Sequence, residues 1–300
     1  MDRLPTIDFR KGELKEGGEE WISLREQVYK ALEEYGCFEA LLDGIPKESL
    51  FEKLKQLKDF PKFDIKYTNP QNSASSFIPL FERLPIEHVL SPGVIEKLSE
   101  ILWPDHGDPQ FCDLLHCFAK ELSKFDEMVR KMVFEKLDIF EKHWDEHKSS
   151  TSCAFAMLRY RVPKADETNL GLPPHTDKRI TTILTSDIVG ADGLQIMKKN
   201  GEWIDAEYSS PNSYIFFVAD ILTALSNGRL QPARHRVFVG NKRRYVMGIS
   251  AAAKEGYIIK IAEELVDEYH PLLYKPFDAS KYYEFVLDGN GNTLESFCGV

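Results

Sequence analysis

The sequence predicts an α+β protein, with helices in the N-terminal half and a β-sandwich or jelly-roll core in the C-terminal half. Two observations support this class. Before about residue 150, apolar side chains recur at spacings of three and four residues, as on one face of a helix. From about Ser152 onward, short runs rich in Val, Ile, Phe, Tyr and Thr are separated by turn residues at intervals of about 8–12 residues.

The N-terminal elements follow from local patterns. We expect a short strand over 5–9 and a helix over 19–34, in which four apolar side chains share one face: Trp21, Leu24, Val28 and Leu32. Gly36 ends this helix, and the apolar run CFEALL over 37–42 predicts a buried strand. A second amphipathic helix is expected over 47–59.

The middle of the chain begins with a region rich in Pro, Asn and Ser. Residues 60–90 predict a long loop, which is a common place for function or motion. Residues 91–148 are expected to be helical throughout, with a long amphipathic stretch over 109–140. The last residues, 262–300, return to a mixture of helix and loop. These patterns divide the chain into an N-terminal region (1–100), linking helices (101–150), a core (151–260) and a closing segment (261–300).

Composition excludes several classes of protein. The 300 residues are 43% hydrophobic and 29% charged, which is typical of a soluble globular chain. No apolar stretch of about 18 residues predicts a membrane span. The first residues have neither the apolar segment of a secretory signal nor the basic character of a transit peptide.

Charge and cysteine content narrow the partners and the compartment. A net charge of −10 argues against a nucleic-acid partner, which usually binds a basic face. The five cysteines are odd in number and contain no CxxC pair, which favours reduced thiols in the cytoplasm. No coiled coil or other oligomerisation signal is visible, so we expect a monomer that binds a small molecule and no membrane.

The segment GLPPHTDKRITTILTSD carries the most informative polar pair. His175 and Asp177 are separated by one residue, so on an extended strand both side chains point to the same face. His235 lies downstream in a second strand-like run, RHRVFVG. Two histidines and one carboxylate form the facial triad of a non-haem Fe(II) site, which leaves coordination positions open. On spacing alone, the alternative is an ordinary loop residue at His175 and a paired strand residue at His235.

An arginine near the second histidine adds to this pattern. Arg244 follows His235 by nine positions, at the start of the alternating run RYVMGISAA. Arginine binds a carboxylate through a two-point fork, so Arg244 is a candidate anchor for the far carboxylate of a 2-oxo diacid. The oxo acid end would then chelate the metal. The alternatives are that Arg244 is an exposed strand residue or that the adjacent Arg243 takes this role.

The chain as a whole resembles the plant 2-oxoglutarate/Fe(II)-dependent dioxygenases, and most closely their AOP-like branch. The N-terminal segments LPTIDF and ALEEYGCFEALLDGIP are similar to that family, as are five segments of the second half: GLPPHTDKRITTIL, DGLQIMKKNGEWI, LSNGRLQPARHRV, EELVDEYHPLLYKPF and FCGV. The resemblance implies a double-stranded β-helix core with helices packed outside it. It also implies an oxidoreductase that uses Fe(II), 2-oxoglutarate and dioxygen, with ascorbate in support, and releases succinate and carbon dioxide.

The resemblance assigns the iron ligands to His175, Asp177 and His235, and the cosubstrate anchor to Arg244. Two departures concern the cosubstrate. Val246 stands where the family often has the serine of an Arg-x-Ser pair, and a lost hydrogen bond to a charged group costs about 1.5–3 kcal/mol.

The second departure lies before the triad, where the family's Asn-Tyr-Tyr reads Arg159-Tyr160-Arg161. Tyr160 is retained. Arg161 either supplies a second cationic contact that compensates for Val246, or is an exposed strand residue.

The substrate pocket is the least defined part of the prediction. Its candidate lining residues are the 60–90 loop, the C-terminal segment and four side chains: Phe155, Met157, Thr223 and Ser250. Ser250 replaces a common aromatic residue, which indicates a roomier or more polar pocket. We expect hydroxylation, desaturation or dealkylation of a small plant specialised metabolite, such as an alkaloid or a terpenoid.

Two alternatives remain open at this stage. One is a hormone-modifying oxygenase that oxidises auxin or gibberellin. The other is a non-catalytic small-molecule binder on the same fold, which the substitutions at Val246, Arg159 and Arg161 favour. The complete set of three iron ligands argues against the binder, because a binder needs no triad.

Overall fold

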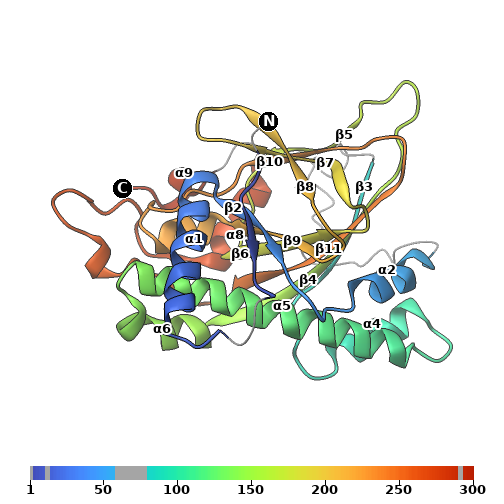
Figure 1. Cartoon of the computed structure of the whole chain (residues 1–300), viewed down its shortest axis with the longest axis horizontal. Coiled ribbons are helices and arrows are strands. Elements are labelled where there is room, and N and C mark those ends of the chain that lie inside the picture. The colour runs from blue at the N-terminus through green and yellow to red at the C-terminus, as the bar shows by residue number, and fades with distance from the viewer. Residues whose placement is uncertain (1–2, 11–13, 58–79, 290–292) are drawn as a thin grey trace.

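The protein is described here by a computed structural model that covers residues 3–10, 14–57, 80–289 and 293–300. Two largely antiparallel sheets face each other, and helices cover the outer face of the larger sheet (Figure 1). This arrangement confirms the predicted α+β class and the jelly-roll core with helices outside it. In the part of the chain that the structure describes, no helix has the length and apolar character needed to cross a membrane.

The larger sheet has seven strands in the described part of the chain, and β1 and β2 form its parallel pair. Its strands in spatial order are β1 (Thr6–Asp8), β2 (Cys37–Leu41), β9 (Ser213–Val218), β6 (Thr181–Ser186), β11 (Arg244–Ala253), β4 (Thr151–Tyr160) and β3 (Phe81–Ile86). The smaller sheet contains, in spatial order, β5 (Leu170–His175), β10 (His235–Phe238), β7 (Gly190–Met197) and β8 (Trp203–Tyr208). A separate short pair joins β12 (Ile258–Ile259) to β13 (Phe277–Asp278).

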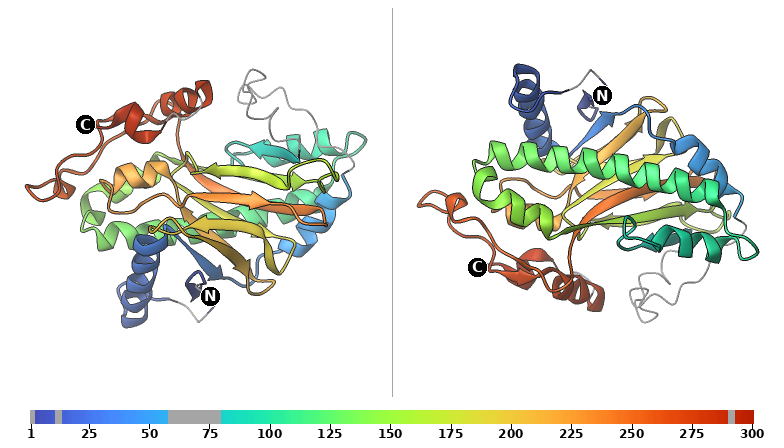
Figure 2. Two further views of the ribbon diagram at one scale, coloured as in Figure 1. Left: turned by 90° about the horizontal axis from the view of Figure 1, so that it is seen from above. Right: turned by 90° about the horizontal axis from the view of Figure 1, so that it is seen from below.

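Most of the helices precede the core strands. They are α1 (Glu19–Tyr35), α2 (Lys47–Lys55), α4 (Val94–Leu102), α5 (Pro109–Lys136) and α6 (Phe140–Ser149). Helix α5 runs across the larger sheet (Figure 2, right). It begins sharply because Pro109 occupies its first turn and the Asp108 side chain accepts a hydrogen bond from the Phe111 amide at 3.0 Å. Later helical elements are α7 (Asp220–Leu225), a 3₁₀ turn (Glu263–Leu265), α8 (Ala279–Asp288) and α9 (Leu294–Cys298).

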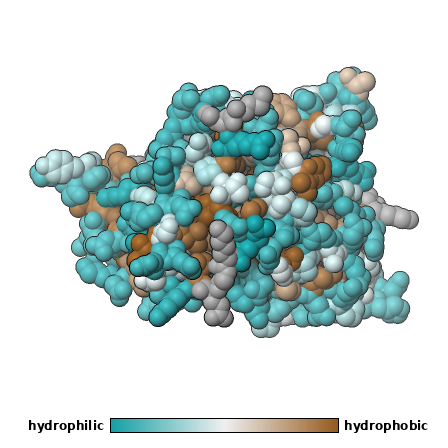
Figure 3. Space-filling view, viewed as in Figure 1, coloured by the Kyte–Doolittle hydropathy of each residue, from teal (hydrophilic) through white to brown (hydrophobic). Residues whose placement is uncertain are grey.

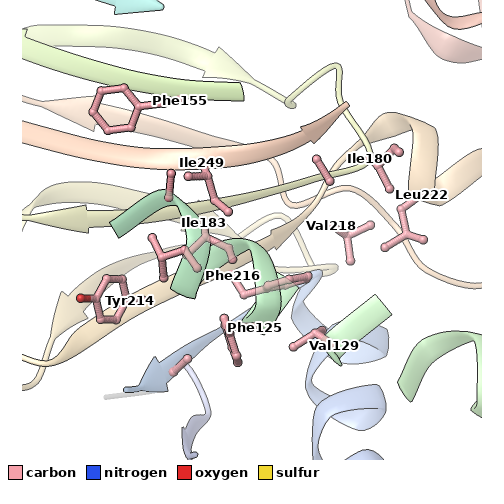
Figure 4. Packing of buried hydrophobic residues seen from close by; sticks show 14 of the residues in the cluster. Phe125, Val129, Phe155, Ile180, Ile183, Tyr214, Phe216, Val218, Leu222 and Ile249 are labelled. Atoms are coloured by element: carbon pink, nitrogen blue, oxygen red, sulfur yellow. The ribbon is translucent and has the colours of Figure 1, made fainter. Parts of the chain in front are cut away.

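The larger sheet is buried on both faces, because successive side chains on a strand point in opposite directions. One face packs against the helices in what we call the outer core, where α5 meets residues of four strands (Figure 4): Phe155, Ile183, Phe216 and Ile249. The other face packs against the smaller sheet in the inner core, whose members include Tyr160, Ile215, Phe217 and Tyr208. Outside these two cores, the surface of the molecule seen in Figure 3 carries mostly polar side chains. Burial on both faces explains why β9, with the sequence SYIFFV, is buried at every position.

The structure confirms most of the expected elements and corrects two. The helix over 19–34 and the strand over 37–42 are present as α1 and β2. The helix expected over 47–59 is present as α2, which ends earlier, at Lys55. Residues 81–86 are a strand and not part of a loop, because they pair with β4 along the edge of the larger sheet. Local sequence does not reveal such a distant partner. Positions 60–79 of the predicted loop lie outside the described residues.

The second correction concerns the helical region. It is not continuous over 91–148, since α4 ends at Leu102 and α5 ends at Lys136. Asp138, between α5 and α6, has a positive φ of 58°, which a helix does not contain. The break lets α6 fold back against α5, with which it packs.

A buried polar network joins α5, α6 and β6. The Arg130 guanidinium donates to Asp126 Oδ2 at 2.7 Å and to His147 Nε2 at 2.7 Å, and the Thr181 hydroxyl donates to Asp126 Oδ1. Burial and the nearby Arg130 charge hold the pKa of His147 well below its usual range, so this imidazole is neutral.

We expect the free energy of unfolding to decrease as the pH falls below about 6.5. The unfolded chain protonates His147 near its ordinary pKa while the folded chain does not, which costs up to about 1.4 kcal/mol per pH unit. His147→Gln keeps an acceptor for Arg130 and should remove the contribution of His147 to the pH dependence of the unfolding free energy. Urea unfolding between about pH 7 and pH 5 measures it, with the exposed His106→Gln as the control. An unchanged slope in His147→Gln would contradict the assignment.

Candidate active site

The three predicted iron ligands converge at the paired ends of two strands. His175 ends β5, His235 begins β10, and the two residues lie opposite each other in the antiparallel register. The Nε2 atoms of His175 and His235 lie 3.7 and 3.9 Å from Asp177 Oδ1. One ligand atom from each residue lies within 4.8 Å of the others, and no other trio of this kind occurs among the described residues.

Backbone carbonyls orient both imidazoles toward the carboxylate. His175 Nδ1 donates to the Pro173 carbonyl at 2.9 Å, and His235 Nδ1 donates to the Ala233 carbonyl at 3.0 Å. In each ring Nε2, the nitrogen that carries the free electron pair of this tautomer, faces Asp177. This is the arrangement that a histidine adopts when the other nitrogen binds a metal.

The electrostatics of the triad also suit a metal ion. Loss of hydration, together with the charge of His235, lowers the pKa of His175 to about 4, so this ring is neutral at physiological pH. Loss of hydration opposes ionisation of Asp177, but the two histidines and a hydrogen bond from Thr182 lower its pKa overall. Two imidazoles and one carboxylate are the donor set of a non-haem Fe(II) centre.

Arg244 lies in a second polar group between the sheets, which we call the Arg244 cluster: Arg244, Asp192, Tyr160 and Tyr208. The Arg244 side chain is 3% exposed, and its Nε donates to Asp192 Oδ2 at 2.7 Å. Its guanidinium lies 5.0 Å from the centre of the Tyr160 ring. Among the described residues, neither Arg244 Nη2 nor the Tyr208 hydroxyl has a hydrogen-bond partner.

These two unpartnered groups indicate a place for an anion. A buried donor without an acceptor costs about 1–3 kcal/mol, and a carboxylate between Arg244 Nη2 and the Tyr208 hydroxyl would remove that cost. Burial raises the pKa of Tyr208 well above its usual range, so its hydroxyl is protonated and available as a donor. The cluster therefore fits the distal carboxylate of 2-oxoglutarate.

A β-bulge places Asp192 beside Arg244. The pairing of β7 with β8 shifts register between Ala191 and Gln195, and Gly193 within this interval has a φ of +91°. A Cβ atom at Gly193 would lie 1.8 Å from the Phe238 carbonyl oxygen, so only glycine fits. The sequence Asp-Gly thus combines the counter-charge and the bend that turns it inward.

Arg243, Arg161 and Arg244, the three arginines considered for binding the cosubstrate carboxylate, differ in their surroundings. Arg243 is exposed, and its Nη1 donates to the Tyr245 hydroxyl at 3.4 Å. Arg161 forms a two-point ion pair with Glu167 at 2.7 and 2.8 Å. Arg244 is thus the arginine that is buried between the sheets.

The remaining departures from the family pattern also have defined places. Val246 lies two residues after Arg244, on the inner face of β11, and is fully buried. Arg159 points to the opposite face of β4 and pairs with Glu82. Sequence reasoning missed Tyr208, although its alternation with Ile204 and Ala206 on β8 marks it as an inward residue.

The four predicted pocket residues lie in different parts of the structure. Ser250 lies on the inner face of β11, with its Oγ 3.5 Å from the Thr182 hydroxyl, which is itself a hydrogen-bond partner of Asp177. Phe155 and Met157 point into the outer core on the helix side of β4, away from the space between the sheets. Thr223 is buried in α7, where its hydroxyl donates to the Ala219 carbonyl. Only Ser250 of these four is brought next to the triad in the described structure.

Comparisons with known proteins decide the family. The model of the 2OG-Fe(II) oxygenase superfamily matches residues 152–250, which include all three predicted iron ligands and Arg244. Over 301 residues the chain is 39% identical to a probable 2-oxoglutarate-dependent dioxygenase AOP1 of Arabidopsis thaliana, with 94% of this chain and 96% of that protein covered. The chain belongs to the 2OG-Fe(II) oxygenase superfamily. It is therefore a 2-oxoglutarate-dependent oxidoreductase.

Solved structures share the fold of this oxygenase. A rice dioxygenase for auxin oxidation matches with a TM-score of 0.78 and 22% identity, covering 99% of this chain and 100% of that one. A full-length Neurospora crassa protein, solved in complex with alpha-KG and 5-formyluracil, matches with a TM-score of 0.75 and 20% identity over 95% of both chains. At these identities the likeness establishes the jelly-roll architecture and not the substrate.

Removal of either histidine should eliminate tight Fe(II) binding. His175→Ala and His235→Ala each leave two donors, and even loss of an outer-shell partner costs about 10–100-fold in metal affinity. Anaerobic calorimetry with Fe(II) measures the effect, with the exposed His106→Ala as the control. Parent-like affinity in either triad variant would contradict the assignment.

Asp192→Asn should destabilise the protein by about 3–5 kcal/mol, because the buried Arg244 charge loses its counter-ion. A bound carboxylate supplies a replacement charge, so Ni(II) with 2-oxoglutarate should raise the melting temperature more in the variant than in the parent. Thermal unfolding with and without the cosubstrate measures both effects. Equal shifts in the two proteins would show that the cosubstrate does not reach Arg244.

Proposed function

We propose that this oxygenase oxidises a small plant specialised metabolite, such as an alkaloid or a terpenoid, with conversion of 2-oxoglutarate to succinate and carbon dioxide. Dioxygen is the oxidant, and ascorbate supports the iron. The observation that carries the proposal is the combination of a complete triad with a buried arginine that has an open donor in the described structure. A metal centre and a carboxylate anchor are the two features that a chelating 2-oxo diacid needs. The 39% identical Arabidopsis relative supports a plant setting.

Each group in the site has a separate task. The three ligands hold Fe(II), which when bound supplies the chemistry that oxidises an unactivated C–H bond. Arg244 and the Tyr208 hydroxyl orient the cosubstrate by its distal carboxylate. Asp192 keeps the Arg244 fork in place, since its bond to Nε leaves Nη2 for the ligand. The inner core keeps water from this carboxylate, which strengthens its attraction to the guanidinium.

The pocket beside the triad favours a substrate with some polarity. Thr182 and Ser250 place two hydroxyl groups next to Asp177, where a larger aromatic residue at position 250 would close the space. Hydroxylation, desaturation and dealkylation all begin with removal of hydrogen from a carbon held near the metal. The outcome therefore depends on which carbon the pocket presents.

We further infer that the protein works as a cytoplasmic monomer. All five cysteines are free, as expected in a reducing compartment. The net charge of −10 disfavours nucleic acids and anionic membrane surfaces as partners.

Arg244→Ala should weaken 2-oxoglutarate binding by roughly 10–150-fold, which corresponds to about 1.5–3 kcal/mol for a charged hydrogen bond. The measurement is an anaerobic titration of the visible charge-transfer band that 2-oxoglutarate forms with bound Fe(II). Arg243→Ala is the matched control, because this neighbour is exposed and outside the cluster. Similar losses in both variants would contradict the assignment of the anchor.

Product analysis separates the rival functions. The protein with Fe(II), 2-oxoglutarate and ascorbate in air is tested for succinate against a panel of plant metabolites that includes auxin and gibberellin. If auxin or gibberellin stimulates succinate formation and no other metabolite of the panel does, the hormone-modifying alternative is favoured. The non-catalytic binder, which Val246 favours, predicts ligand binding without succinate above the His175→Ala background.

A further inference from the structure

Arg83 lies on the inner face of the edge strand β3. In the register with β4, Phe81 pairs with Tyr160 and Arg83 pairs with Leu158. The Phe81 ring lies 5.2 Å from the Tyr160 ring, so Phe81 points toward the inner core. Arg83 is two residues further along the same strand and shares that face, whereas Leu84 is buried in the outer core.

The Arg83 guanidinium has no hydrogen-bond or ion-pair partner among the described residues, and the side chain is exposed. Its neighbour Glu82 points to the opposite face, where Arg159 binds it. The register continues from Arg83 through Leu158 to Val246 of β11, whose inner face also carries Ser250. In agreement with this placement, the Arg83 charge contributes to the lowered pKa of Asp177. With Fe(II) held by the triad, the Asp177 carboxylate would pair with the metal, and Arg83 would keep no ion-pair partner among the described residues.

The cosubstrate does not need this arginine. One end of 2-oxoglutarate is assigned to the metal and the other to the Arg244 cluster, which is buried between the sheets. Arg83 is instead exposed on β3, the edge strand of the larger sheet, and is not part of the Arg244 cluster.

We propose that Arg83 binds a carboxylate of the primary substrate, so that the metabolite is a small organic acid. A single guanidinium fork matches one carboxylate, while a phosphate dianion would call for further cations in a chain with a net charge of −10. This inference rests on the proposed function, since it assigns the substrate class of the same site. It makes Arg83 a specificity-determining residue.

The test compares organic acids with their methyl esters. Indole-3-acetate, cinnamate, benzoate and a wider set of plant acids are each paired with the corresponding ester, which has nearly the same shape and no charge. Binding is measured anaerobically on the Fe(II)–2-oxoglutarate protein, as a change in the charge-transfer band, and by calorimetry with Ni(II) in place of iron. The proteins are the parent, Arg83→Gln, Arg83→Lys and the control Arg243→Gln.

We expect at least one acid to bind the parent about tenfold or more tightly than its ester, as befits one charge-assisted contact. Arg83→Gln should bring that acid to the level of its ester, and Arg83→Lys should keep part of the preference. Arg243→Gln should keep all of it. The affinity for 2-oxoglutarate in the absence of an acid should be the same in all four proteins, which also shows that each variant is folded.

Three results would overturn the inference. In the first, no acid of the set binds more tightly than its ester. In the second, the preference survives in Arg83→Gln. In the third, Arg83→Gln weakens 2-oxoglutarate itself, which would assign Arg83 to the cosubstrate. Failure of the proposed function is distinct, because the parent protein would then form no charge-transfer band at all.

Discussion

The antiparallel pairing of β5 with β10 is the interaction on which the site depends. It sets His175 opposite His235, and the chain that leaves β5 brings Asp177 to the same point. A shift of one residue in this register would turn one histidine to the other face of the sheet and leave two ligands. The hydrogen bonds that the two Nδ1 atoms donate to the Pro173 and Ala233 carbonyls then fix which nitrogen of each ring faces the metal position.

Burial of the larger sheet on both faces decides which residues can take part in chemistry. Alternate residues of β4 and β11 belong either to the outer core beneath α5 or to the space between the sheets. Phe155 and Met157 therefore stabilise the helix packing, while Ser250 reaches the triad. The helices and the seven-stranded sheet act as a rigid frame, which is what a site needs to hold ligands within fractions of an ångström.

A buried ion pair prepares the protein for an acidic cosubstrate. Arg244 would be costly in this interior without a counter-charge, and Asp192 supplies it through one nitrogen of the guanidinium. The open Nη2 and the Tyr208 hydroxyl remain as donors for a carboxylate. Val246 offers no hydroxyl beside Arg244, whereas the Tyr208 hydroxyl is a donor without a partner among the described residues. The Arg161 guanidinium is paired with Glu167.

The sequence by itself determined the class of fold and predicted the three iron ligands and the anchoring arginine, because these depend on local periodicity and on motifs with few chemical meanings. Only the tertiary structure brought Asp192 and Tyr208 to Arg244 and placed Arg83 on the inner face of β3. Each of them meets its neighbours through pairing between strands that are far apart in the chain, and such pairing leaves no local pattern. For the same reason the sequence did not reveal β3 or show which face of β4 carries Phe155. The direction of a side chain on a doubly buried strand follows from the register alone.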